Sequence, residues 1–147
     1  MKKADIEFER VLFGITSLVD KWWYLDGHLQ MDVRFLEIQI GTGTDISEVD
    51  IPDAILVFKG VGTCKRSVVE ILFGGSSART SEETDNSENP SEEELNGYGF
   101  SAQSAEPSGN INWAIRAHSF VLYLREEDLK KIEEAENAVS TDKNRTW

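Results

Sequence analysis

Alternation of apolar and polar residues is the feature that most constrains the fold of this chain. Every second residue of Leu29–Phe35 is apolar, which is typical of a strand with one buried face. The alternation then continues in the opposite phase, with Leu36, Ile38 and Ile40 as the next apolar set. Because a shift of one residue turns every side chain to the other face of a sheet, we expect a β-bulge near Phe35 and Leu36.

The same alternation, with a second change of phase, occurs late in the chain. The apolar residues on either side of this change are Ile111, Trp113, Ile115 and Ala117, followed by Phe120, Leu122 and Leu124. We therefore expect a strand here with a second bulge near His118 and Ser119. Residues Tyr98–Ala105 form a further, shorter strand candidate.

Two other segments are apolar at nearly every position, Ala54–Lys59 and Val68–Phe73. A continuous apolar run of this length indicates a central strand that is covered on both faces. We predict two such strands, joined through the glycine-containing residues 60–66. The glycines there lack the third glycine and the following helix of a dinucleotide-binding fingerprint, so they indicate a turn.

Helices are expected at both ends of the chain. In residues 5–20 the apolar side chains recur at spacings near three and four, and Asp26-Gly27 is a turn signal shortly afterwards. Arg125–Val139 has the pattern of an amphipathic helix. With the strands grouped between these helices, the predicted fold class is α+β. It comprises a mainly antiparallel sheet, or a small sandwich, of about five or more strands flanked by an N-terminal and a C-terminal helix.

Length and charge limit the possible functions. The 147 residues predict a single domain over 1–147. With 15 basic and 27 acidic residues the net charge is −12, which disfavours direct binding to nucleic acid or to a membrane surface. No apolar leader follows Met1, so we expect a cytoplasmic protein. Oligomeric state is left open.

Residues 75–96 carry a net charge of −6, half of the total, and one large apolar residue. Such a composition buries too little surface to offset the entropy of ordering, so we predict a disordered acidic insert at 75–96 and a frayed tail at 140–147. The alternative to a merely solvated loop is a surface that steers a basic partner. The acidic residues assigned to steering are Glu82, Glu83, Asp85, Glu92, Glu93 and Glu94.

An aromatic cluster is the main candidate for partner binding. Trp22, Trp23 and Tyr24 are adjacent, and consecutive side chains point in different directions, so at least one must be partly exposed. Trp and Tyr are favoured at recognition surfaces. We therefore assign partner binding to these three residues with Asp26 and His28; the alternative is a helix-to-strand junction that plugs the edge of the core.

No catalytic residue, metal site or cofactor is assigned. His28 and His118 are the only histidines, and no nucleophile motif accompanies them. Cys64 lies beside Lys65 and Arg66, whose charges favour the thiolate, but no base is placed by a motif. A small hydrolase or transferase with a histidine-centred site remains an alternative function. A small-ligand carrier, which needs an apolar cavity inside the sheet, is another.

The Trp22, Asp26 and His28 junction, the sequence AILVFKGV at 54–61 and the late strand pair resemble the small β-rich immunity proteins encoded beside bacterial polymorphic toxins. The resemblance covers residues 22–124. It implies a protein that binds and blocks one toxin, with no catalysis. In the nearest such family the histidine tends to precede the aspartate, whereas here Asp26 precedes His28. The expected partner is accordingly a basic protein such as a toxin or nuclease.

Overall fold

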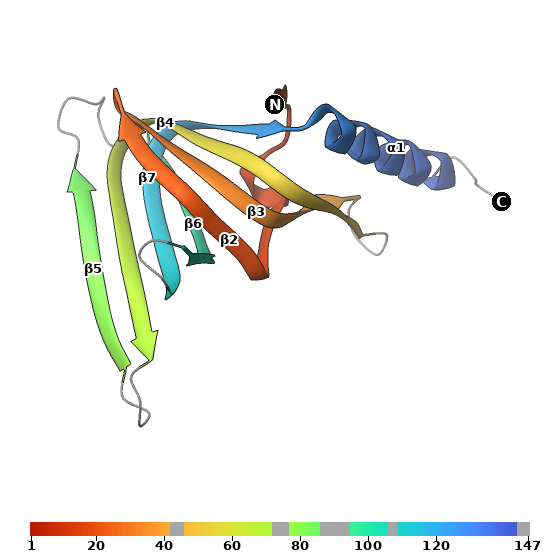
Figure 1. The fold of residues 1–147 in the computed structure, drawn as a ribbon. Coiled ribbons are helices and arrows are strands. Elements are labelled where there is room, and N and C mark those ends of the chain that lie inside the picture. Colours follow the sequence, from red (N-terminus) through yellow and green to blue (C-terminus); the bar gives the residue numbers. More distant parts are fainter. Residues whose placement is uncertain (42–45, 72–76, 86–94, 106–108, 144–147) are drawn as a thin grey trace.

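A computed structural model describes residues 1–41, 46–71, 77–85, 95–105 and 109–143. The chain is mostly β-structure, drawn in Figure 1. In chain order the elements are β1 (Lys2–Ala4), the short 3-10 helix η1 (Phe8–Arg10), β2 (Val11–Leu25), β3 (His28–Ile40), β4 (Ser47–Ile71), β5 (Ser77–Asp85), β6 (Asn96–Ser104), β7 (Gly109–Leu124) and the helix α1 (Glu126–Lys143).

Five strands close into a barrel. The antiparallel neighbours run β2–β3–β4–β7–β6, and a short parallel pairing of Leu18 and Val19 with Gln103 and Ser104 joins β6 back to β2. Strand β1 adds to the edge of β7, and β5 pairs with the second half of β4, which projects from the barrel in Figure 1. The predicted α+β sheet or sandwich between two helices is therefore wrong, because the sheet closes on itself and α1 is the one α-helix of the described residues.

The predicted N-terminal helix at 5–20 does not form. These residues build η1 and the first part of β2, which pairs with β3. Gly14 and the β-branched Thr16 have poor helix propensity, and pairing with a neighbouring strand outweighs the remaining helical pattern. Ile15, placed by the helical spacing on the apolar face, is 90% exposed.

The turn at Asp26-Gly27 is confirmed. Both residues have positive φ, 52° and 76°, as a two-residue hairpin turn requires. Trp22–Leu25 are thus the last residues of β2 and not a junction between a helix and a strand.

Strand β4 is one 25-residue strand where the sequence predicted two. Gly60, with φ of 64°, lies between Phe58 and Val61, which are both buried although they are three positions apart and would point to opposite faces of a regular strand. The pairing with β7 runs without a shift from Lys59–Ser119 to Val61–Ala117, so no bulge forms at His118 and Ser119, although β7 changes its buried face there. The register shifts one step later, between Val61 and Thr63 of β4. The glycines that were read as a turn instead let a continuous strand bend and change phase.

The bulge expected at Phe35 and Leu36 is confirmed and is larger than a single residue. Phe13 pairs with Leu36 and Leu18 with Arg34, so residues 14–17 of β2 lie opposite Phe35 alone. The fully buried Ser17 hydroxyl accepts a hydrogen bond from the Gly14 N–H (2.9 Å) and donates one to the Phe35 carbonyl (2.7 Å). Phe35 itself has φ of 61°, a left-handed conformation that costs energy for a side chain of this kind.

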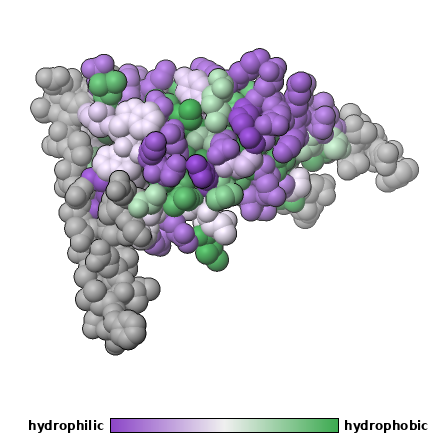
Figure 2. Space-filling view, in the orientation of Figure 1, coloured by the Kyte–Doolittle hydropathy of each residue, from purple (hydrophilic) through white to green (hydrophobic). Residues whose placement is uncertain are grey.

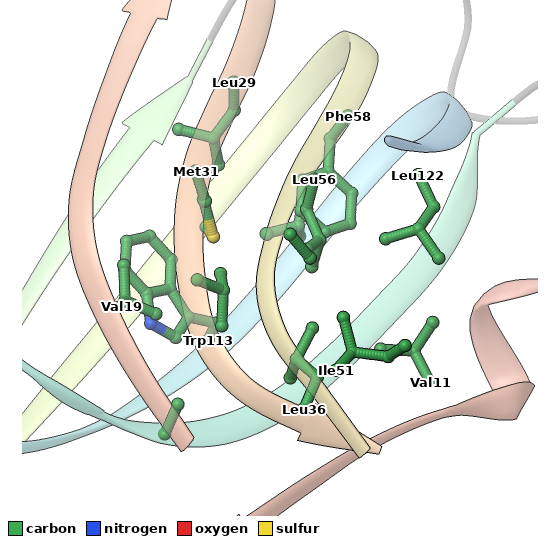
Figure 3. Packing of buried hydrophobic residues seen from close by; sticks show 14 of the residues in the cluster. Val11, Val19, Leu29, Met31, Leu36, Ile51, Leu56, Phe58, Trp113 and Leu122 are labelled. Atoms are coloured by element: carbon green, nitrogen blue, oxygen red, sulfur yellow. The ribbon is translucent and has the colours of Figure 1, made fainter. Parts of the chain in front are cut away.

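Large side chains fill the interior of the barrel, as Figure 3 shows for residues including Met31, Leu56, Phe58 and Leu122. Phe8 of η1 covers one end and has ring contacts with Phe13, Phe58, Tyr98, Phe100 and Phe120. Side chains therefore occupy the space in which a small-ligand carrier would hold its ligand.

The C-terminal helix is confirmed, and it continues to Lys143. It begins at Glu126 and packs Leu129, Ile132 and Ala135 toward the core. Within the segment 75–96 that was predicted to be a disordered insert, residues 77–85 are in strand β5 and Asn96 begins β6, whereas 75–76 and 86–94 lie outside the described residues. Residues 144–147 of the predicted tail also lie outside them.

Replacing Gly60 by Ala tests the bend in β4. A Cβ on Gly60 would lie 2.9 Å from the Cβ of His118, in a backbone conformation that L-residues rarely adopt. We expect Gly60→Ala to lower the free energy of unfolding by about 1–3 kcal/mol, measured by urea denaturation. The control is Gly97→Ala in β6, where no heavy atom lies within 4 Å of the added Cβ and stability should not fall. Equal stability of the two variants would contradict a requirement for glycine at position 60.

Replacing Phe35 by Asn tests the strain in the bulge. Asn tolerates the left-handed region better than Phe, and the Phe35 side chain is 54% exposed and loses little burial. We expect Phe35→Asn to raise the free energy of unfolding by about 0.5–1 kcal/mol. Phe35→Leu keeps the strain and should give no gain. A less stable Phe35→Asn protein would show that contacts of the ring outweigh the backbone strain.

Candidate functional site

The predicted aromatic cluster divides between the two faces of β2. Trp22 and Tyr24 are half-buried and pack against the core, whereas Trp23 and Leu25 point outward and are 39% and 64% exposed. Figure 2 shows apolar colour among hydrophilic side chains near the tip of the β2–β3 hairpin. Trp23 is therefore the one of these three aromatic residues that is exposed to a partner, together with Asp26 and His28 at the hairpin tip.

Trp22 has a structural environment inside the barrel. The guanidinium carbon of Arg66 lies 3.9 Å from the centre of the Trp22 ring, and Trp113 meets that ring edge-on at 5.6 Å. Burial lowers the pKa of Arg66, which is 9% exposed. A cation held between two indoles in this way stabilises the end of the barrel.

His28 ties the hairpin to β4. Its Nδ1 accepts a hydrogen bond from the Gly60 N–H (3.2 Å), and the Gly27 carbonyl accepts one from the Val61 N–H (2.8 Å). His118 lies beside Gly60 as well, so the fold brings the two histidines near one glycine. In the described part of the chain, no hydrogen bond or ion pair joins either imidazole to a carboxylate, and Asp26 lies exposed in the turn.

Cys64 is buried in the core, and burial raises the pKa of its thiol to about 11 against the opposite effect of Arg66. The thiol is therefore protonated at neutral pH. Desolvation of the Cys64 thiolate therefore raises the pKa more than the neighbouring positive charge lowers it.

A groove between the N-terminal segment and the β6–β7 pair, here called the N-terminal groove, has a volume of about 520 Å³. Asp5, Glu7 and Glu9 line one side of it and are exposed to solvent. Three aromatic rings, which belong to Phe8, Tyr98 and Phe120, also line it. Phe8 holds these rings together, because it meets Tyr98 edge-on at 5.1 Å and Phe120 edge-on at 5.2 Å.

The N-terminal groove follows from a pattern with period two. In Asp5–Glu9 charged residues alternate with Ile6 and with Phe8, the first residue of η1. Ile6 and Phe8 pack against the core, whereas the three carboxylates are exposed. Sequence reasoning missed this groove because the helical spacing of residues 5–20 was given more weight. The alternation over Asp5–Glu9 is the signal that identifies it.

The electrostatics of the N-terminal groove favour a cation. Within the described residues, Asp5, Glu7 and Glu9 form no ion pair with a lysine or arginine. The pKa of Tyr98 is raised by burial and further by the negative charge of Glu9, while a hydrogen bond with Asn96 acts in the opposite direction. Carboxylates beside aromatic faces bind the ammonium of lysine or the guanidinium of arginine.

The residues assigned to steering are only partly described. Glu82, Glu83 and Asp85 lie in β5, at register positions opposite Arg66, Lys65 and Thr63 of β4. Glu92, Glu93 and Glu94 lie outside the described residues. Their steering role stays a prediction. Throughout the described ranges, no group of three or more His, Cys, Asp or Glu side chains is arranged to hold a metal ion.

Comparison of the chain with protein families, curated proteins and solved structures gave no match. The helices of the described ranges include none with the length and apolar character of a membrane span. Function is therefore argued from the geometry above.

Alanine substitutions in the aromatic cluster separate its structural member from its exposed one. Trp22→Ala removes the ring that packs on Arg66 and Trp113, and we expect a loss of about 2–4 kcal/mol in the free energy of unfolding. Trp23→Ala should cost less than about 1 kcal/mol, because the ring faces solvent. Thermal and urea denaturation of both variants measure this. A large loss for Trp23→Ala would make Trp23 part of the core and unsuited to a test of binding.

Proposed function

We propose that this chain is a non-enzymatic protein-binding module whose N-terminal groove receives a basic segment of a partner protein. The observation that carries the proposal is the line of three exposed carboxylates, Asp5, Glu7 and Glu9, beside the rings of Phe8, Tyr98 and Phe120. A lysine or arginine placed there gains charge-assisted hydrogen bonds and contact with the aromatic faces at the same time.

The whole-molecule charge supports the same partner class. A net charge of −12 raises the rate of encounter with a basic protein and disfavours encounter with an acidic one. Rim charges act mainly on association, whereas buried contacts set dissociation. In this scheme the acidic surface brings the partner in, and the aromatic side of the groove holds it.

A more specific form of this function is an immunity protein that blocks a basic toxin or nuclease in the cytoplasm. Its support is the acidic character of the chain together with the sequence resemblance over residues 22–124. Co-expression with the product of a neighbouring toxin gene tests it, since protection of the host cell is expected from the native chain and not from a groove variant. If the native chain gives no protection, the protein is not an immunity protein against that toxin. The more general proposal of a binding groove is then tested by the peptide experiment below.

A histidine-centred enzyme is the second candidate, because His118 and Ser119 also line the N-terminal groove. His118→Asn distinguishes the two functions. In a binding protein this substitution weakens partner affinity by no more than about fivefold, since most interface residues contribute less than about 1 kcal/mol. In an enzyme it abolishes turnover of the substrate.

Peptide binding tests the proposed groove directly. The probe is a ten-residue peptide of alternating Lys and Gly, titrated into ¹⁵N-labelled protein at low salt. We expect chemical-shift changes at Asn96, Gly97 and Tyr98, and about five- to tenfold weaker binding to Glu7→Gln/Glu9→Gln. The matched control is Glu133→Gln/Glu134→Gln on the exposed side of α1, which makes the same change in net charge.

Two results would contradict the groove. One is equally weakened peptide binding by the groove variant Glu7→Gln/Glu9→Gln and by the α1 variant Glu133→Gln/Glu134→Gln, which would show that only the overall charge matters. The other is equal binding of a Glu/Gly peptide of the same length. The proposal is supported if peptide binding is weakened in the groove variant alone and if the difference between this variant and the native protein disappears in 0.5 M salt.

A further inference from the structure

We propose that the bulge between β2 and β3, together with the pocket beside it, is a second protein-docking surface, one that takes an apolar side chain flanked by a lysine or arginine. This bulge surface comprises Ile15, Thr16, Phe35 and the acidic residues Glu37 and Asp50. Its lining shares no residue with the N-terminal groove, so the proposal does not depend on that groove.

The fold maintains backbone strain in this bulge. Phe35 has φ of 61°, and the buried Ser17 hydroxyl fixes the loop by bonding to both Gly14 and the Phe35 carbonyl. Pro52 lies in the adjacent strand at the position facing Phe35, between the register pairs Arg34–Asp53 and Leu36–Ile51. Left-handed bulky residues persist only where the surroundings over-determine them, and they cluster at binding and switch sites.

The strained bulge exposes two apolar side chains. The bulge projects Ile15, which is 90% exposed, and leaves Phe35 54% exposed. Figure 2 shows a strongly hydrophobic projection at the lower edge of the molecule, below the first part of β2. A regular register at this position would not require the three extra residues of β2 that carry Ile15 outward. The structure thus holds two apolar side chains in solvent through a costly backbone, which is the arrangement expected of an anchor for a partner.

A pocket of about 430 Å³ adjoins these side chains. Thr16 and Phe35 line it from the bulge, Ile51 and Pro52 from β4, and Lys131 from α1. Its volume is sufficient for one apolar side chain of a partner, with Phe35 as one wall. The occupant is therefore a short protruding segment and not a flat face.

Charge decides what flanks the apolar group. Glu37, Glu48 and Asp50 are close together on the β3–β4 ladder, where Glu37 pairs with Asp50 and Gln39 with Glu48. Across the described residues, none of the three forms an ion pair with a lysine or arginine. Lys131, the one basic residue of the pocket lining, is already held by Asp128 at 3.5 Å.

The clustered carboxylates repel one another, and a hydrogen bond with Glu48, together with desolvation, raises the pKa of Glu37. A lysine or arginine on the partner would relieve this repulsion. A second copy of this chain is the less suitable occupant, since two chains of net charge −12 repel each other. The observations therefore favour a basic partner segment that carries an apolar residue.

Selection of peptides tests the proposal without a known partner. The probe is a random twelve-residue peptide library displayed on phage, selected on the intact protein and counter-selected on the double variant Ile15→Ser/Phe35→Asn. Both substitutions are at exposed positions, and Asn suits the backbone of residue 35, so the variant keeps the fold, as circular dichroism and denaturation will verify. Enriched peptides are then measured by fluorescence anisotropy on the native protein, on this variant and on Glu7→Gln/Glu9→Gln.

Enriched peptides are expected to combine a large apolar residue with an adjacent Lys or Arg. Their affinity should fall at least tenfold on the Ile15→Ser/Phe35→Asn protein, at least threefold on Glu37→Gln/Asp50→Asn, and less than twofold on the groove variant. Enrichment of peptides without a basic residue, or retention of full affinity by the double variant, would overturn the proposal. Peptides that depend only on Glu7 and Glu9 would support the N-terminal groove and overturn the bulge surface. Failure to enrich any peptide would overturn the bulge surface as well.

Discussion

The barrel depends on the ability of β4 to bend and to change the face that it buries. This strand pairs with β3 in its first half, with β7 along most of its length and with β5 in its second half. Phe58 and Val61 both point inward, which a regular strand forbids, and Gly60 makes it possible by taking a left-handed conformation. His28 and Gly27 bond to the same bend, so the β2–β3 hairpin is positioned by it. The bend at Gly60 therefore allows the barrel to close. Side chains fill its interior, so both candidate binding surfaces lie on the outside.

Features set by local chemistry could be predicted, and features set by pairing could not. Asp26-Gly27 specifies its own turn, and the phase change at Phe35 marks its own bulge, since both signals lie in adjacent residues. The residues of β2 instead showed helical spacing, and only pairing with β3 and β6 makes them a strand. Glycines 60 and 62 indicate a turn between two predicted strands, yet they lie inside one strongly bent strand. The N-terminal groove could not be predicted, because it also depends on pairing. One of its sides is formed by Asp5–Glu9, which the helical spacing assigned to a helix, and His118, Tyr98 and Phe120 line it from strands that are distant in sequence.

The bulge surface is maintained against a cost in stability, which comes from the conformation of Phe35 and from the mutual repulsion of Glu37, Glu48 and Asp50. Native proteins retain such local conflicts where function requires them, because stabilising substitutions are otherwise easy to acquire. The N-terminal groove likewise presents carboxylates, those of Asp5, Glu7 and Glu9, that form no ion pair with a lysine or arginine of the described residues. Both surfaces thus accept a positive charge supplied from outside, and this agreement is a stronger argument for a basic partner than the net charge of the chain.

The rigidity of the barrel has a consequence for how such a partner would be bound. Phe8 is packed by five other rings, and Ser17 fixes the bulge by two hydrogen bonds, so neither surface has to be ordered when a partner arrives. Association then loses less conformational entropy than it would with flexible loops, and more of the contact energy remains as affinity. Long-range charge accelerates encounter, but it is screened by salt and changes dissociation little. Tight binding therefore requires the rings and the apolar side chains of Ile15 and Phe35 in addition to the acidic surface, since these are the groups that desolvate when a partner is seated.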